Sequence, residues 1–147
     1  MSAFLSKGTG RVALLHLTAG GKLQESIRDE CKRVGIMTGI VSCGIGSLRK
    51  IVYHYTDSDT EKPLDVHKTV ERPMELVSLQ GIVLEGEPHL HVLATESGSV
   101  CHSGHLEDGT EVLYLAELSV VEVLDLPLGR RSGKYGTVTH FEYLGEE

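Results

Sequence analysis

The sequence lacks the features that would point to a nucleic-acid-binding or membrane protein. Its formal net charge is −7, and its densest basic cluster is only Arg130, Arg131 and Lys134, so unaided binding to DNA phosphates is disfavoured. No apolar run approaches the roughly 18 residues that a membrane-spanning helix needs, and the first residues lack the apolar segment of a signal peptide. We therefore expect a cytoplasmic protein that contacts neither a membrane nor nucleic acid directly.

Cysteine is scarce as well. Cys31, Cys43 and Cys101 are odd in number and far apart, which is typical of reduced thiols rather than of a disulfide framework. The sequence shows no internal repeat of solenoid length and no domain boundary. Its 147 residues, 40% of them hydrophobic, suit one domain with a sizeable core. We expect a single domain over residues 1–147.

Histidine, in contrast, is concentrated in one stretch. Four of the eight histidines fall between residues 89 and 105. Side chains alternate along a strand, so His89 and His91 project from one face about 6.6 Å apart. Either His102 or His105, on a glycine-rich return loop, could add a third imidazole. Three histidines with a vacant position are the ligand set of an open, catalytic-type zinc site.

The apolar pattern predicts an α+β fold with a largely antiparallel sheet and one or two helices. A helix is expected over 23–34, where apolar residues including Cys31 recur at helical spacing and Gly35 follows as the C′ residue. His16 has no second ligand nearby and is interpreted as structural. Strands are expected over residues 11–17, 37–43, 48–55, 66–71, 75–84, 87–92, 111–126 and 137–144.

Three connections are also expected from the sequence. Gly44-Ile45-Gly46 is interpreted as a tight joint between two strands, residues 56–65 as a polar surface loop, and residues 127–136 as an irregular turn region. Strands 11–17 and 111–126 carry apolar residues at both parities. Both are therefore expected to be covered on both faces, by the rest of the chain or by a partner subunit.

Several motifs, taken in order, resemble one known family. They are Leu17-Thr-Ala-Gly20-Gly21, Val41-Ser-Cys-Gly44-Ile-Gly46-Ser-Leu48, Met74-Glu75-Leu76-Val-Ser78-Leu79-Gln-Gly81, Pro88-His89-Leu-His91, Ser103-Gly104-His105-Leu106 and Ala116-Glu117-Leu118. Together they are similar to the Plant and Prokaryote Conserved (PPC) domain in its free-standing prokaryotic form. The resemblance implies an α+β fold, a homotrimer with sites near subunit boundaries, and a divalent metal, zinc by preference, on His89, His91 and His105.

The sequence departs from the family pattern in two places. Ser103 stands where the family has a second glycine, and His102 is an additional histidine, so both His102 and His105 remain candidates for the third ligand. The plant members carry an Arg-Gly-Arg-Pro hook that enters the minor groove. Here Arg72-Pro73 stands without the preceding Arg-Gly, so the family's DNA-binding label does not transfer.

Two classes of function follow. In the first, a zinc ion with an open position lowers the pKa of bound water toward about 7 and polarises a small carbonyl or carboxylate molecule. The resemblance extends to the fold of acetolactate decarboxylase, a zinc enzyme with a His-x-His pair, and implies a metal-dependent lyase or hydrolase if the protein is an enzyme. Glu75 and Glu117 are the candidates for orienting a ligand or acting as general base.

In the second class, the protein is a trimeric regulatory or scaffold module. Its metal would be structural or sensory, and it would meet DNA only through a partner.

Overall fold

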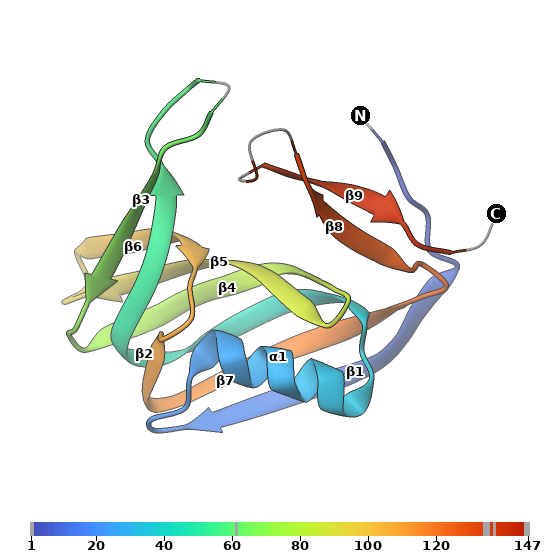
Figure 1. The fold of residues 1–147 in the computed structure, drawn as a ribbon. Coiled ribbons are helices and arrows are strands. Elements are labelled where there is room, and N and C mark those ends of the chain that lie inside the picture. The colour runs from blue at the N-terminus through green and yellow to red at the C-terminus, as the bar shows by residue number, and fades with distance from the viewer. Residues whose placement is uncertain (1, 61, 134–135, 137, 146–147) are drawn as a thin grey trace.

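The structure, a computed structural model, describes residues 2–60, 62–133, 136 and 138–145. Its elements are β1 (Gly8–Thr18), α1 (Leu23–Val34), β2 (Thr38–Thr56), β3 (Asp65–Val70), β4 (Met74–Leu84), β5 (Glu87–Glu96), β6 (Val100–Leu106), β7 (Glu111–Leu124), β8 (Leu128–Ser132) and β9 (Thr139–Tyr143). Seven strands form one antiparallel sheet, and β8 and β9 form a second, two-stranded one (Figure 1). The α+β expectation is confirmed, with one helix in the described part of the chain.

Helix α1 covers the range that the sequence predicts. Leu23, Ile27 and Cys31 lie one turn apart and are at most 1% exposed, so their shared face packs into the core. The helix ends at Gly35, whose φ of 75° is the left-handed C′ conformation, and the amide of Ile36 donates to the carbonyl of Cys31. Within the described residues, no helix has the length and apolar character needed to cross a membrane.

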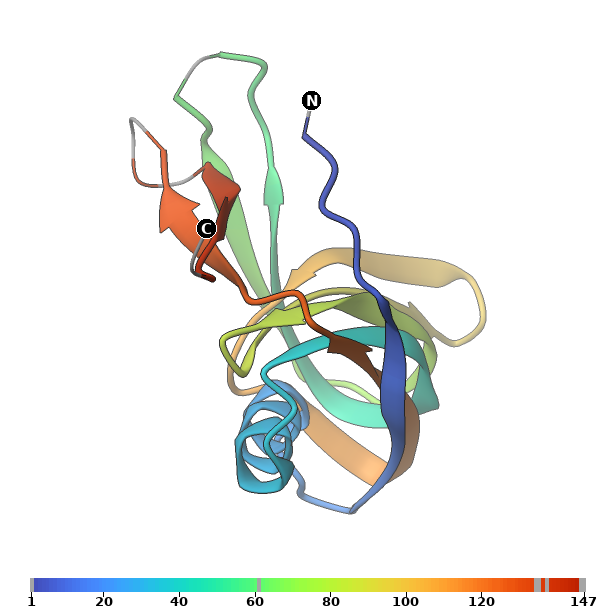
Figure 2. The same ribbon diagram turned by 90° about the vertical axis from the view of Figure 1, so that its right-hand side faces the viewer.

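The main sheet curls back on itself through strand β2. The strand order is β1-β7-β2-β4-β5-β6, and β3 pairs with β2. The first part of β2 pairs with β7 and β4, whereas its last part pairs with β3 and β6. Because β6 bonds to both β5 and β2, the sheet is strongly curved, and α1 lies on one side of it (Figure 2).

The expected joint at Gly44-Ile45-Gly46 is wrong, because β2 runs without interruption from Thr38 to Thr56. Its bend is absorbed by three register shifts against β7, one before the glycine segment and two after it, as β-bulges allow. Gly46 has a positive φ of 153°, and a Cβ there would collide with the backbone of Leu115. The glycines therefore permit close packing of β2 on β7 rather than a chain reversal.

Two other expected irregular segments contain strands. The return loop is confined to residues 97–99, and the residues that follow form β6. Ser97 and Gly98 both have positive φ, which suits a tight hairpin turn. The region 127–136 contains β8, where cross-strand pairing with β9 brings Gly129 opposite Glu142 despite the glycine content. The polar loop between β2 and β3 is confirmed, and Thr137, expected in the last strand, lies outside the described residues.

One face of β1 is bare within the chain. Leu15 and Leu17 are buried, but Val12 and Leu14 on the opposite side are 60% and 82% exposed. Ile45 on β2, which is separated from β1 by β7, is 56% exposed. The expectation that this strand is covered on both faces is therefore not met by the chain alone, since α1 packs only on the inner side.

Candidate metal centre

Three of the histidines that the sequence singled out lie together. One ligand nitrogen from each of His89, His91 and His105 lies within 4.8 Å of the other two. The ring centroids of His89 and His105 are 4.6 Å apart, and the His105 ring is nearly perpendicular to both of the others. The three imidazoles therefore converge from two neighbouring strands on one point.

The register of β5 and β6 explains this convergence. His91 and His105 are direct cross-strand partners, and His89 lies two residues before His91, on the same face. His102 pairs with Ala94 and points to the opposite face, where its Nδ1 lies 3.5 Å from the Tyr53 hydroxyl. Of the two histidines left open by the sequence, the structure brings His105 to the pair.

Glycine at position 104 fixes the position of His105. Gly104 has a φ of 156°, and a Cβ there would collide with the backbone carbonyl of His54. The missing side chain lets β6 approach β2 closely, and His105 becomes the register partner of His54. Their rings stack with centroids 4.5 Å apart.

Burial keeps two of these imidazoles neutral. It lowers the pKa of His89 to about 4, with smaller contributions from the charges of His105 and Arg130. Burial also lowers the pKa of His105, followed by the neighbouring charge of His54. Neutral imidazole is the form that binds a metal, so at neutral pH these rings hold a lone pair ready for an ion.

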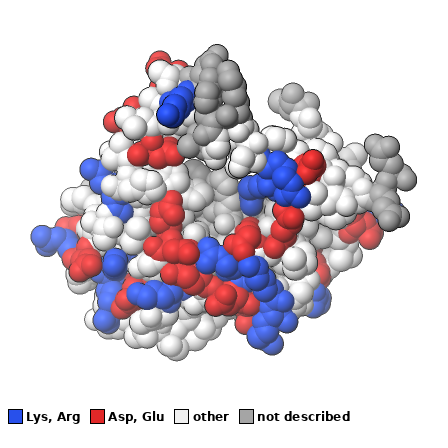
Figure 3. Space-filling model, in the orientation of Figure 1, with Lys and Arg blue, Asp and Glu red and all other residues white. Residues whose placement is uncertain are grey.

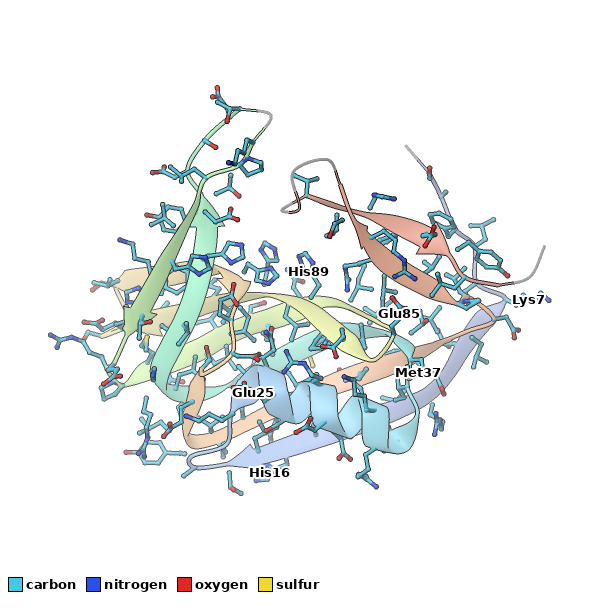
Figure 4. The ribbon with its side chains drawn as sticks, in the orientation of Figure 1. Lys7, His16, Glu25, Met37, Glu85 and His89 are labelled. Atoms are coloured by element: carbon cyan, nitrogen blue, oxygen red, sulfur yellow. The ribbon has the colours of Figure 1, made fainter. Side chains whose placement is uncertain are left out.

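The cluster lines a cavity of about 300 Å³ between the β2–β3 hairpin and the β8–β9 side of the molecule. Figure 4 shows His89 in this region and His16 at the far edge of the sheet. A larger cavity of about 450 Å³ lies beside Phe4 and Phe141, but none of the described residues that line it is titratable. The cavities beside β1 contain one histidine among their described residues, His16, whereas the smaller cavity is lined by four.

The two carboxylates that the sequence proposed lie elsewhere. Glu117 is on β7 beside His16, with 3.3 Å between Oε1 and Nδ1. Glu75 is on β4 opposite Ser47 and Thr95, and it lines a separate cavity. The structure brings neither of them to the three histidines.

The sequence analysis missed three residues around the cluster. His54 stacks on His105, and its Nδ1 lies 2.5 Å from Oε1 of Glu107. Arg130, on β8, donates to the carbonyl of Ile82, whose register partner is His89. Glu107 could have been predicted from the sequence, because alternation along a strand places it on the same face as His105. The positions of His54 and Arg130 beside the cluster depend on contacts between segments that are distant in the sequence.

The structure is therefore that of a β-rich domain in which three histidines on a curved antiparallel sheet line one cavity. The family model of the Plants and Prokaryotes Conserved (PCC) domain matches residues 5–124, so the chain belongs to this family. The resemblance seen in the sequence motifs is thereby confirmed.

Solved structures agree with this assignment. A metal-containing protein from Archaeoglobus fulgidus is 25% identical, with a TM-score of 0.81 over 99% of this chain and all of that chain. A plant- and prokaryote-conserved protein from Pyrococcus horikoshii is 28% identical, with a TM-score of 0.79 over the same shares. A candidate DNA-binding protein from Bacteroides thetaiotaomicron is 20% identical, with a TM-score of 0.75 over 95% of this chain and 96% of that one. No protein of curated function matches the chain.

The donor set fits a transition-metal ion. Ligand nitrogens at 2.0–2.1 Å from a tetrahedral zinc ion lie roughly 3.4 Å apart. The nitrogens of His89, His91 and His105 already lie within 4.8 Å of one another, so small side-chain rotations would complete the site. His91 is exposed, and the other two histidines are half-buried. Since all three line the cavity, an ion bound to them could take a further ligand from it.

Proposed function

We propose that the protein binds a divalent metal ion, zinc by preference, on His89, His91 and His105, and uses it to bind or convert a small carbonyl or carboxylate molecule. The observation that carries the proposal is the convergence of three ligand nitrogens on the wall of a cavity of about 300 Å³. The metal-containing relative from Archaeoglobus fulgidus supports the presence of an ion. Zinc is preferred because three neutral imidazoles are a common zinc ligand set.

The chemistry depends on the fourth position. A bound zinc ion would supply Lewis acidity and a water of lowered pKa. The chain's own residues orient and shield that position: the register of β5 and β6 fixes the rings, and the half-buried setting of His89 and His105 reduces solvent screening.

Arg130 favours an anionic ligand. It is half-buried on β8, and its guanidinium donates to the carbonyl of Ile82 beside His89. Among the ion pairs between described residues, none joins Arg130 to a carboxylate, whereas its neighbour Arg131 pairs with Glu85 and Glu142. The Arg130 guanidinium contacts two backbone carbonyls and lies over the ring of Phe141, and a guanidinium with no carboxylate partner among the described residues suits a substrate carboxylate.

Assembly as a homotrimer is part of the proposal. The outer face, which we define by Val12, Leu14, His16, Ile45 and Glu117, carries three large apolar side chains that are more than half exposed. Burial of such a surface stabilises association, and a closed ring of three copies covers it in every subunit.

Surface charge disfavours direct binding of the chain to DNA. Acidic and basic side chains are intermixed on the face shown in Figure 3. The ion pairs of α1, such as Arg28 with Glu87 and Asp108, are part of this mixture. Phosphate binding needs a contiguous basic surface instead.

The first test is elemental analysis of protein purified without a metal-affinity tag, followed by chelation. We expect about one tightly held zinc ion per chain in the three-histidine site, and its removal should leave secondary structure and assembly intact. Thermal stability should fall only by the linkage to metal binding. Purified protein that holds no ion and takes up none from added zinc would refute the proposal.

The second test measures small carboxylates by calorimetry on the zinc-loaded chain. Arg130→Gln should weaken their binding at least about tenfold, since a hydrogen bond to a charged group contributes roughly 1.5–3 kcal/mol. Metal content should not change. Arg131→Gln is the matched control, because this guanidinium already has carboxylate partners. Equal effects of the two substitutions would remove Arg130 from the ligand site.

A further inference from the structure

We propose that His54, His67 and Glu107 form a second binding site for a first-row divalent metal ion, beside the three-histidine centre. One ligand atom from each of the three residues lies within 4.8 Å of the other two. The residues come from β2, β3 and the chain just after β6. None of them belongs to the His89–His91–His105 set, so this site does not depend on that one being occupied.

The strand register builds the site. His54 is the cross-strand partner of His67 on one side and of His105 on the other. Partners of this kind have Cβ atoms about 5 Å apart on one face of the sheet. The ring centroids of His54 and His67 are 5.1 Å apart, so their nitrogens reach a common point.

Glu107 completes the set through its position in the chain. It lies two residues after His105, which returns its side chain to the same face. The amide of Glu107 donates to the carbonyl of Val52 at 2.9 Å, so its backbone is tied to β2. Its Oε1 lies 2.5 Å from Nδ1 of His54. A bound cation would replace the proton shared in this contact, as happens when such groups become metal ligands.

The donor chemistry indicates the class of ion. Two imidazoles and one carboxylate bind catalytic zinc in some enzymes and ferrous iron in others, and in both cases further positions stay open. Unlike an exposed acidic cluster, this set has His54 and Glu107 with side chains only 21% and 30% exposed. Its two imidazoles favour first-row transition metals over calcium or magnesium.

The two sites are neighbours. His54 stacks on His105 with centroids 4.5 Å apart, and both rings line the same cavity of about 300 Å³. The register continues from His67 through His54 and His105 to His91, one histidine on each of four adjacent strands. A second cation here would add positive charge to the cavity and favour an anionic ligand further.

The competing interpretation is purely structural. In it, the Glu107 carboxylate holds His54, and His54 in turn supports the ring of His105. The exposed His67 separates the two interpretations, because it contacts His54 but lies on β3, away from His105. Its loss would remove a ligand of the second site without removing the support of the first.

The experiment is a zinc titration of chelator-treated full-length protein, followed by calorimetry and native mass spectrometry. We expect two ions per chain in the wild type and one ion in His67→Ala and in Glu107→Gln. We also expect one ion in His89→Ala and none in the His67→Ala/His89→Ala double variant. His16→Ala should keep two ions, since His16 also pairs with a carboxylate but lies on the outer face. Circular dichroism would establish that each variant is folded.

The proposal would be overturned by one ion per chain in the wild type at saturating zinc. Two ions in His67→Ala would overturn it equally. A His89→Ala variant that holds no ion would also overturn it, because the second site should fill without the first. Two ions in His89→Ala together with one in His67→Ala would refute the first site and leave the second intact, so the two sites can fail separately.

Discussion

The histidine cavity and the outer face place similar residues on the same sheet with different results. On the outer face, His16 stands beside Glu117, and the apolar Leu14 and Ile45 line the adjoining groove. In the cavity, four histidines from β2, β5 and β6 line the walls, and His67 on β3 lies beside His54. The outer face also lines a groove, of about 340 Å³, but at β6 the sheet curls back onto β2 and brings the histidines of four strands together. Curvature therefore turns alternating side chains into a site.

Removal of the histidine ligands one at a time should have the largest effect on the cavity. His105→Ala should reduce zinc affinity at the first site by at least about 100-fold, similar to His89→Ala and His91→Ala, because each leaves only two imidazoles. His102→Ala should leave the affinity nearly unchanged, since that ring contacts Tyr53 and Glu96 on the other face. Competition with a zinc chelator gives the affinities.

A strong loss in His102→Ala together with a weak one in His105→Ala would reverse this ranking. It would mean that the register of β5 and β6 differs from the one described.

The next substitution addresses the outer face. Leu14→Asp places a charge at an 82% exposed apolar position, which costs little in a monomer but several kcal/mol inside an interface. We expect the trimer to dissociate into 16.0 kDa chains at micromolar concentration in sedimentation. Leu64→Asp, at a 60% exposed apolar position in the loop between β2 and β3, is the control outside the outer face. A wild type that sediments as a monomer would contradict the assembly.

A smaller effect is expected from the glycine that brings β6 to β2. Gly104→Ala should lower the free energy of unfolding by about 1–3 kcal/mol, because the backbone lies in a region that side chains avoid and the new Cβ meets the His54 carbonyl. Zinc affinity should fall as His105 is displaced. Gly98→Ala, which meets no atom within 4 Å, controls for the strain of a positive φ alone.

Local patterns were sufficient to predict some of these features. The spacing of Leu23, Ile27 and Cys31 predicted α1, and alternation predicted that His89 and His91 share a face. The sequence favoured a joint at Gly44 to Gly46 because glycine is common both in turns and at close strand contacts. Only the observed pairing of β2 with β7 shows that these glycines serve a close strand contact and not a turn.

Long-range register accounts for what could not be predicted at the site. His54 and His67 become neighbours because β2 and β3 pair across the intervening loop. Arg130 reaches His89 because β8 lies against β4 and β5. Local patterns contain no information on which strands pair or where the sheet curls, so the surrounding residues were missed while the His-x-His motif was found.

The smallest effect that we predict concerns an ion pair between β1 and β7, beside the C-terminal end of α1. Hydrogen bonds from the side chain and backbone of Arg11 lower the pKa of Glu122 from 4.5 to about 2, and the guanidinium nitrogen lies 2.7 Å from the carboxylate. A lowered carboxyl pKa stabilises the folded chain above about pH 4.5, and this contribution is lost as the pH falls toward 2. Glu122→Gln should therefore lower the urea midpoint at pH 7, and the difference from wild type should shrink steadily below pH 4.5. Glu75→Gln, at an exposed position on β4, should change little at either pH. A difference between Glu122→Gln and wild type that stays constant from pH 7 to pH 2 would assign the effect to packing instead of charge.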